Sequence, residues 1–224
     1  MPKSCIELSC PDYDLINADI VRYLETRTEI LQRDPRKDPG IKVPYPNFVD
    51  TKDFIQHNPR LAKYFEELGM HLFHVYYAVA WESKSTHSKN LFDNFGDPNT
   101  VSSCPIHLDR PPVQWKMNWP VMNMIGTGTR FYRLKNSDDD VMTYLVRTGI
   151  AGSLETDIWN LPYEPFEEMH RHVFGPAPIL MNGLIPHDVW FNDQMPMPRI
   201  GLQMMFFKEP RHLIDNDCIV LNTN

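Results

Sequence analysis

A histidine and a carboxylate stand two residues apart in His107-Leu108-Asp109, which is the strongest candidate for chemistry in the chain. Alternate side chains of a β-strand point to the same face, so His107 and Asp109 would face one point in space. His187, whose approach is stiffened by Pro186, is the best candidate for a third ligand. Two histidines and one carboxylate leave positions open on an octahedral metal ion. We therefore expect His107, Asp109 and His187 to form a catalytic metal site.

Arg199 lies about a dozen residues beyond His187 and opens the apolar segment 199–207. An arginine is unusual at the start of so apolar a segment. A guanidinium group can bind a carboxylate through two parallel hydrogen bonds. In 2-oxoglutarate the keto acid end chelates iron and the distal carboxylate requires a cation. Arg199 is therefore the residue that we expect to bind this co-substrate.

Taken together, these four residues resemble the pattern of the Fe(II)/2-oxoglutarate-dependent oxygenases, which is His-x-Asp, a distant His and then an Arg. The phrases Pro186-His187-Asp188-Val189 and Trp119-Pro120-Val121-Met122-Asn123 are similar to the aspartyl/asparaginyl β-hydroxylase-like branch of that superfamily. The resemblance covers residues 104–207. It implies a double-stranded β-helix (jelly-roll) core, Fe(II) as the metal, 2-oxoglutarate as co-substrate, and hydroxylation of a substrate with O2.

Two positions depart from what the resemblance implies. Many members carry Arg-x-Ser, in which the hydroxyl helps to hold 2-oxoglutarate, whereas this chain has Gly201. In the branch named above the carboxylate ligand is often missing, whereas Asp109 is present here.

Lys116 and Asn118 lie on one face of the next expected strand, and Trp115, Met117 and Trp119 lie on the other. If the polar face lines the interior of the barrel, Lys116 and Asn118 contact the co-substrate or the substrate. If the aromatic face lines it instead, that face fills the core.

The elements that must position these residues follow from periodicity and turn signals. Apolar spacing predicts helices over 11–33 and 58–68, the second with Pro59 in its first turn, and a strand over 70–81. The polar segment 82–103 is expected to be a loop and a candidate lid. Further strands are expected near 104–108, 114–124, 129–134, 141–147, 154–159, 178–183, 187–191 and 199–207. A helix is expected over 165–172, with His170 and His172 on its solvated face, where they would chelate a metal poorly.

Composition supports a mainly β, α+β chain with N-terminal helices. The 224 residues include 20 prolines but only 10 glycines, and 42% are hydrophobic. Proline breaks helix interiors and central strands, and this hydrophobic content argues against disorder. We expect residues 1–69 to be a helical extension packed on a β domain of residues 70–224, both in one compact unit.

Charge and cysteine content limit the partners. The net charge of −7 disfavours nucleic acid, which requires clustered cations. No apolar run approaches the ~18 residues of a membrane span, and no signal segment is evident. Four scattered cysteines favour reduced thiols in the cytoplasm. Oligomeric state leaves no signature in the sequence.

Two other functions remain open at this point. One is a non-enzymatic jelly-roll protein that binds a partner or serves a structural role, because a fold does not fix a function. The other is a cupin-like metalloenzyme that does not use 2-oxoglutarate. The substrate of an oxygenase could be a peptide side chain, an amino acid or another small metabolite.

Overall fold

Strands dominate the regular structure of the residues that the computed structural model describes, which are 3–27, 47–80, 102–109, 114–144, 146–147, 159–190, 196 and 198–215. The helices are α1 (Tyr13–Glu25), α3 (Thr51–His57), α4 (Pro59–Glu67), α6 (Arg211–Asp215) and the short 3-10 helix η1 (Val141–Tyr144). The strands are β1 (Cys5–Glu7), β2 (Asn47–Val49), β3 (Leu72–Ala80), β4 (Ser102–Leu108), β5 (Trp115–Met122), β6 (Gly128–Leu134), β7 (Val146–Arg147), β8 (Trp159–Asn160), β9 (Phe166–Val173), β10 (Ile179–Asn182), β11 (His187–Trp190) and β12 (Arg199–Phe206). The expectation of a mainly β chain with N-terminal helices is confirmed.

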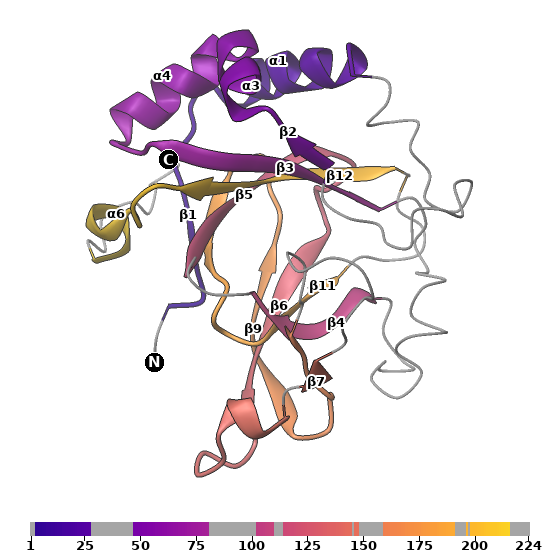
Figure 1. Ribbon diagram of the computed structural model, residues 1–224. Coiled ribbons are helices and arrows are strands. Elements are labelled where there is room, and N and C mark those ends of the chain that lie inside the picture. Colours follow the sequence, from indigo (N-terminus) through magenta and orange to yellow (C-terminus); the bar gives the residue numbers. More distant parts are fainter. Residues whose placement is uncertain are drawn as a thin grey trace.

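Two antiparallel sheets form the body of the molecule (Figure 1). Sheet A has the strand order β1-β10-β5-β12-β3-β2, and sheet B has the order β7-β8-β4-β11-β6-β9. From β3 to β6, and again from β9 to β12, each strand lies in the other sheet from the one before it. Residues far apart in the sequence therefore meet between the two sheets.

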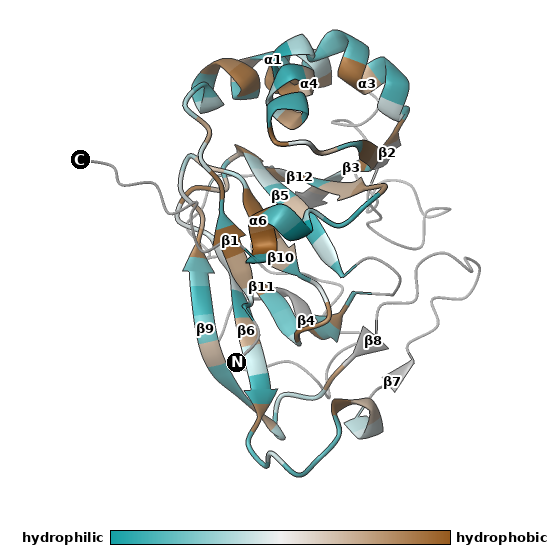
Figure 2. Cartoon of the chain, turned by 90° about the vertical axis from the view of Figure 1, so that its left-hand side faces the viewer, coloured by the Kyte–Doolittle hydropathy of each residue, from teal (hydrophilic) through white to brown (hydrophobic). Residues whose placement is uncertain are grey.

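The N-terminal helices cover the outer face of sheet A (Figure 1). In Figure 2, α1 and α4 show alternating hydrophilic and hydrophobic bands, as amphipathic helices do. Trp119 of β5 stacks on Tyr13 of α1 at 5.3 Å between ring centroids and meets Tyr64 of α4 edge-on at 6.0 Å. Trp115 and Met117 belong to the same core. The aromatic face of β5 thus packs against the helices, and Lys116 and Asn118 face the interior between the sheets.

Most expected elements are present with shifted ends. The segment 11–33 contains α1, but residues 28–33 lie outside the described part of the chain. The expected helix over 58–68 is α4, which starts at Pro59 and is followed by Gly69 in the left-handed region, at φ 63°. The helix α3 was not expected. The expected loop over 82–103 lies outside the described residues up to 101, and its last two residues begin β4.

Two expectations are wrong. The segment expected as a helix over 165–172 is β9, which pairs along its length with β6. Eight residues are too few for an apolar period to distinguish a helix from a strand, and the ladder decides. The strand expected over 141–147 begins as η1, because the Asp140 carboxylate accepts a hydrogen bond from the backbone N–H of Met142 at 2.9 Å. Strand structure there is confined to β7.

A buried carboxylate fastens β11, the strand that begins with His187. Asp188 is fully buried and accepts hydrogen bonds from Nε and Nη2 of Arg130 on β6. The hydroxyls of Tyr132 and Tyr163 also donate to Asp188, at 3.1 Å and 2.6 Å. Neighbouring residues of a strand face opposite ways, so this anchor lies on the face away from the His187 side chain.

We expect Asp188→Asn to lower the free energy of unfolding by about 3–5 kcal/mol, because it leaves the Arg130 guanidinium buried without its carboxylate. Urea denaturation measures this. The matched control is Glu167→Gln, which breaks the exposed Arg133–Glu167 pair of the same sheet and should cost less than about 1 kcal/mol. Equal losses in the two variants would contradict the assignment of Asp188 as the anchor.

Candidate metal centre

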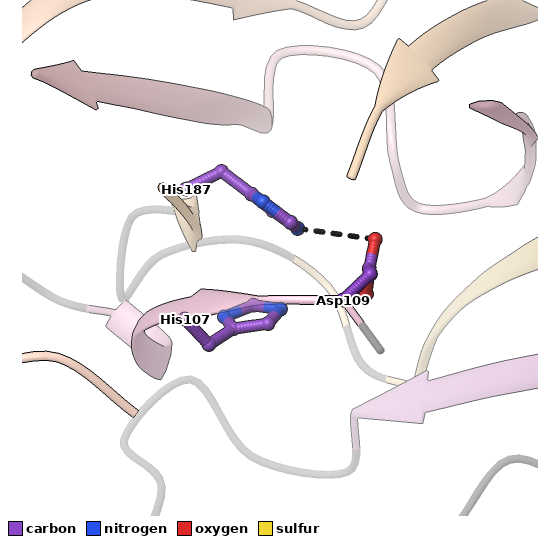
Figure 3. A group of neighbouring side chains, drawn as sticks. All are labelled: His107, Asp109 and His187. Atoms are coloured by element: carbon purple, nitrogen blue, oxygen red, sulfur yellow. Dashed lines mark ion pairs between the residues drawn. The ribbon is translucent and has the colours of Figure 1, made fainter. Parts of the chain in front are cut away.

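The two histidines predicted as metal ligands meet across a strand pair. His107 lies near the end of β4 and His187 begins β11, and the two are direct partners in the antiparallel ladder. Their ring centroids are 4.2 Å apart, and both side chains are buried. Asp109 follows β4 and turns toward them (Figure 3). One ligand atom from each of the three residues lies within 4.8 Å of the other two. This group could hold a metal ion.

A glycine creates the space for the carboxylate ligand. The backbone N–H of Asp109 donates to the carbonyl of Gly183 at 2.9 Å, and Gly183 N–H donates to the carbonyl of Gln114 at 2.8 Å. A Cβ at Gly183 would lie 2.3 Å from Oδ2 of Asp109. No side chain larger than hydrogen therefore fits at this position without moving the carboxylate. Gly183 was not identified from the sequence, which placed it at the end of the strand expected near 178–183.

The tautomer of His187 is fixed by a backbone carbonyl. Nδ1 of His187 lies 2.8 Å from the carbonyl oxygen of Ile185, which can only accept, so Nδ1 carries the hydrogen. Nε2 then presents a lone pair, as a metal ligand must. Burial lowers the pKa of His187 to about 3, and the neighbouring His107 and Lys116 act in the same direction. His187 is therefore neutral at neutral pH.

The Asp109 carboxylate faces this lone pair. Its Oδ2 lies 3.6 Å from Nε2 of His187. Burial alone would raise the pKa of Asp109, but the Lys116 ammonium group, at 2.6 Å, together with His187 and His107 outweighs this and the pKa falls to about 2. Two electron-pair donors thus face each other, an arrangement that a cation between them would stabilise. Two imidazole nitrogens and one carboxylate oxygen form a donor set suited to a divalent transition metal.

Polar side chains of sheet A face this group from the other side of the interior. Lys116 Nζ lies 3.0 Å from Oε1 of Gln203 on β12, and the hydroxyl of Tyr76 on β3 donates to the same oxygen. Asn118 is buried, with Nδ2 2.7 Å from the sulfur of Met181. The structure thus places Lys116 beside the ligand set, with the polar face of β5 inside, and its contact with the co-substrate or the substrate stays a prediction. Gln203 and Tyr76 were missed, although Gln203 shares its strand face with Arg199 and could have been found from that spacing.

Arg199 begins β12 and is 5% exposed. Its Nε donates to Oγ1 of Thr127 at 3.1 Å, and the Thr127 hydroxyl donates to the carbonyl of Met124 at 2.6 Å. Burial lowers the pKa of Arg199 to about 10, so the guanidinium stays charged at neutral pH. Its central carbon lies 6.0 Å from the ring centroid of Phe174.

An apolar cluster connects Arg199 to the histidines. Phe174 and Phe131 belong to this cluster, together with Met124, Ile179, Met181 and Ile185. The ring centroids of Phe131 and His187 are 6.1 Å apart, and Phe174 of the same cluster lies beside Arg199. The arginine and the predicted ligand thus border the same packed region.

The hydroxyl group that a serine at position 201 would place near Arg199 is absent in this chain, and Thr127 supplies a hydroxyl group there instead. A Cβ at Gly201 would lie 2.5 Å from the sulfur of Met124, so a serine does not fit there while Met124 keeps its place. The hydroxyl next to Arg199 comes instead from Thr127, in the turn that precedes β6. Sequence reasoning missed Thr127 because the turn is distant from Arg199 in the chain.

His170 and His172 lie on a strand and not on the helix expected for them, so their side chains share one face. Nε2 of His170 is 3.5 Å from the sulfur of Cys5. The His172 ring packs edge-on against Phe174 at 5.5 Å, and its Nε2 has no hydrogen-bond partner among the described residues. Burial, with His170 nearby, lowers the pKa of His172 to about 4. Neither histidine belongs to the group that could hold a metal.

Comparison of the chain with models of known families, with curated proteins and with solved structures found no significant match. Within the described residues, no helix is both long enough and apolar enough to cross a bilayer.

The lowered pKa of His172 predicts how stability depends on pH. Between an unfolded pKa near 6.5 and the folded value of about 4, the unfolded chain binds a proton that the folded chain does not. The free energy of unfolding should therefore decrease as the pH falls through this range, and His187 adds to the slope. We expect His172→Phe to reduce the slope, measured as urea midpoints from pH 7 to pH 4.5.

The control for this measurement is Val173→Phe, at the exposed neighbouring position, which adds an aromatic ring and keeps the histidine. It should retain the full slope. A slope that is the same in His172→Phe and in the unsubstituted protein would be evidence against a half-buried, neutral His172.

Proposed function

We propose that this chain is a non-haem Fe(II)- and 2-oxoglutarate-dependent oxygenase that hydroxylates a small molecule or a peptide side chain. The observation that carries the proposal is the buried group of His107, Asp109 and His187, in which the lone pairs of an imidazole and a carboxylate face each other at 3.6 Å. A facial set of two histidines and one carboxylate with open positions is the arrangement of non-haem Fe(II) oxygenases.

We also propose that the core is a jelly roll. Support comes from eight strands that divide into β10-β5-β12-β3 of sheet A and β4-β11-β6-β9 of sheet B. A jelly roll is a double sheet of eight strands built from two Greek keys, and the chain switches sheet at every step between these eight strands except the step from β6 to β9. In this arrangement β4 and β11, which carry the histidines, are direct neighbours.

When bound, Fe(II) and 2-oxoglutarate would supply the electrons that activate O2, so that one oxygen atom enters a C–H bond and the other enters succinate as 2-oxoglutarate loses CO2. The protein contributes geometry. Asp109 and the two histidines would hold the metal, and the carbonyl of Ile185 keeps the hydrogen of His187 on Nδ1, away from it. Arg199 would hold the distal carboxylate of 2-oxoglutarate. The apolar cluster around Phe131 and Phe174 keeps water from this region.

The choice of 2-oxoglutarate rests on Arg199. A buried guanidinium that stays charged in apolar surroundings is stabilised by a carboxylate bound through two hydrogen bonds. Thr127 accepts from Nε and so fixes the plane of the guanidinium group.

The first test is metal and co-substrate binding. Under anaerobic conditions, Fe(II) and 2-oxoglutarate together should give the weak visible charge-transfer band of the chelated keto acid, and succinate should form once O2 is admitted. His107→Ala and Asp109→Ala should abolish both signals because each removes a ligand. His71→Ala, at an exposed position outside the site, is the control and should retain them. An unsubstituted protein that gives neither band nor succinate would refute the proposal.

The second test separates the oxygenase from a metalloenzyme that does not use 2-oxoglutarate. Arg199→Ala should weaken 2-oxoglutarate binding by about 2–5 kcal/mol, at least thirtyfold, and leave Fe(II) affinity unchanged. Thr127→Val should weaken it by about fivefold, because one hydrogen bond that orients the guanidinium is lost. Thr127→Ser keeps the hydroxyl and serves as the control. Full activity of Arg199→Ala would favour the other metalloenzyme.

A further inference from the structure

A buried lysine contacts the carboxylate of the candidate metal centre from the opposite sheet. Lys116 of β5 is 5% exposed, and its Nζ lies 2.6 Å from Oδ2 of Asp109. The same oxygen lies 3.6 Å from Nε2 of His187. The carboxylate oxygen that faces the imidazole lone pair is therefore also the partner of a buried cation.

Two polar side chains of sheet A hold the ammonium group at this place. Nζ of Lys116 lies 3.0 Å from Oε1 of Gln203, and the hydroxyl of Tyr76 donates to the same oxygen. Gln203 of β12 is the direct ladder partner of Tyr76 on β3. An exposed lysine has a flexible stem and turns away from an approaching cation, whereas this one is held between Asp109 and Gln203.

A metal ion bound by Asp109 would lie close to this ammonium group. Bonds from a carboxylate oxygen to a transition metal such as Zn(II) are about 2.0–2.2 Å long. Because Nζ lies 2.6 Å from Oδ2, a metal on that oxygen lies within about 5 Å of Nζ, whatever the angle between the two contacts. The bound metal and Lys116 would therefore be two positive charges at short range.

This proximity has two opposite effects on metal binding. The ammonium group repels a divalent ion, and it also orients the carboxylate that binds the ion. With an effective dielectric constant of about 20, a single and a double charge within about 5 Å change a binding constant by more than about a thousandfold. Loss of a hydrogen bond that orients a ligand costs about 10–100-fold in metal affinity. Repulsion is therefore the larger effect.

The sign of this effect does not depend on the other groups around Lys116. Removal of one positive charge makes the electrostatic potential at the metal more negative, whatever else surrounds the ammonium group. An acidic group that pairs with Lys116 would act in the same direction, because its negative charge would no longer be compensated after the substitution. The comparison of a charged with a neutral residue at position 116 is therefore sufficient.

We infer that Lys116 lowers the affinity of the site for its divalent metal and so determines how readily the metal exchanges. Lys116 acts through Asp109 and through space, without binding the metal, because an ammonium group has no lone pair. It is thus a positioning and tuning residue, which is a different role from contact with the co-substrate. The inference rests on the metal site of the proposed function.

The test measures the dissociation constant of Mn(II) by isothermal titration calorimetry, for the full chain and its variants without 2-oxoglutarate. Lys116→Met removes the charge and keeps an unbranched side chain of similar length. It should bind Mn(II) at least about tenfold more tightly than the unsubstituted protein, because the repulsion that is lost exceeds the orientation that is lost. Lys116→Gln is also neutral and gives the same test if the methionine variant does not fold.

Two controls separate the local charge from other causes. Lys116→Arg keeps the positive charge and should leave the dissociation constant within about threefold. Lys63→Gln, in the exposed pair with Glu67, changes the net charge of the chain by the same amount as Lys116→Met and should leave the constant unchanged. A purely structural role of Lys116 predicts the opposite sign, because a loosened site binds its metal more weakly.

Unchanged or weaker Mn(II) binding by Lys116→Met, or equally tighter binding by Lys63→Gln, would overturn the inference. An unchanged Mn(II) constant together with weaker 2-oxoglutarate binding would assign Lys116 to the co-substrate instead. Failure of the oxygenase appears separately, as variants that bind Mn(II) in the expected order while the protein gives neither charge-transfer band nor succinate. Absence of Mn(II) binding in every variant would refute the metal site and this inference together.

Discussion

The register between β4 and β11 is the constraint on which the candidate site depends. His107 and His187 are direct partners in this ladder, so their rings meet at 4.2 Å. A slip of one residue would turn every side chain of β11 to the other face. It would place Asp188 in the interior and His187 outside. The Arg130–Asp188 pair opposes such a slip, because the carboxylate finds its four hydrogen bonds only in the observed register.

The two faces of β5 divide the molecule into a packing side and a chemical side. Trp115, Met117 and Trp119 pack under the helices, whereas Lys116 and Asn118 face sheet B. The helices therefore supply the apolar contacts that hold sheet A in place. The interior between the sheets is left partly polar, which is costly in a core and useful in a binding site.

Local spacing was sufficient to predict that His107, Asp109 and His187 come together as a group that could hold a metal ion, because they lie on or next to strands whose alternation is legible in the sequence. The same alternation placed Lys116 and Asn118 on one face of β5 but left open whether that face lies inside, which the packing of the helices decides. Thr127 and Gly183 could not be predicted in the same way. Each lies in a turn that meets its partner residue, Arg199 or Asp109, only after the chain has folded. The segment containing His170 and His172 was assigned to a helix, since eight residues can suit either period and only the ladder with β6 decides. The jelly-roll topology remains a proposal that the strand order supports.

The close contact between Gly201 and Met124 makes substitutions at positions 201 and 124 depend on each other. Met124 occupies the space that a side chain at 201 would need, and its carbonyl also orients Thr127. A serine at 201 would require the end of the flexible Met124 side chain to turn aside or residue 124 to become smaller. The residue type tolerated at one of the two positions therefore depends on the residue at the other. Relatives of this chain should carry these two residues as a pair that changes together.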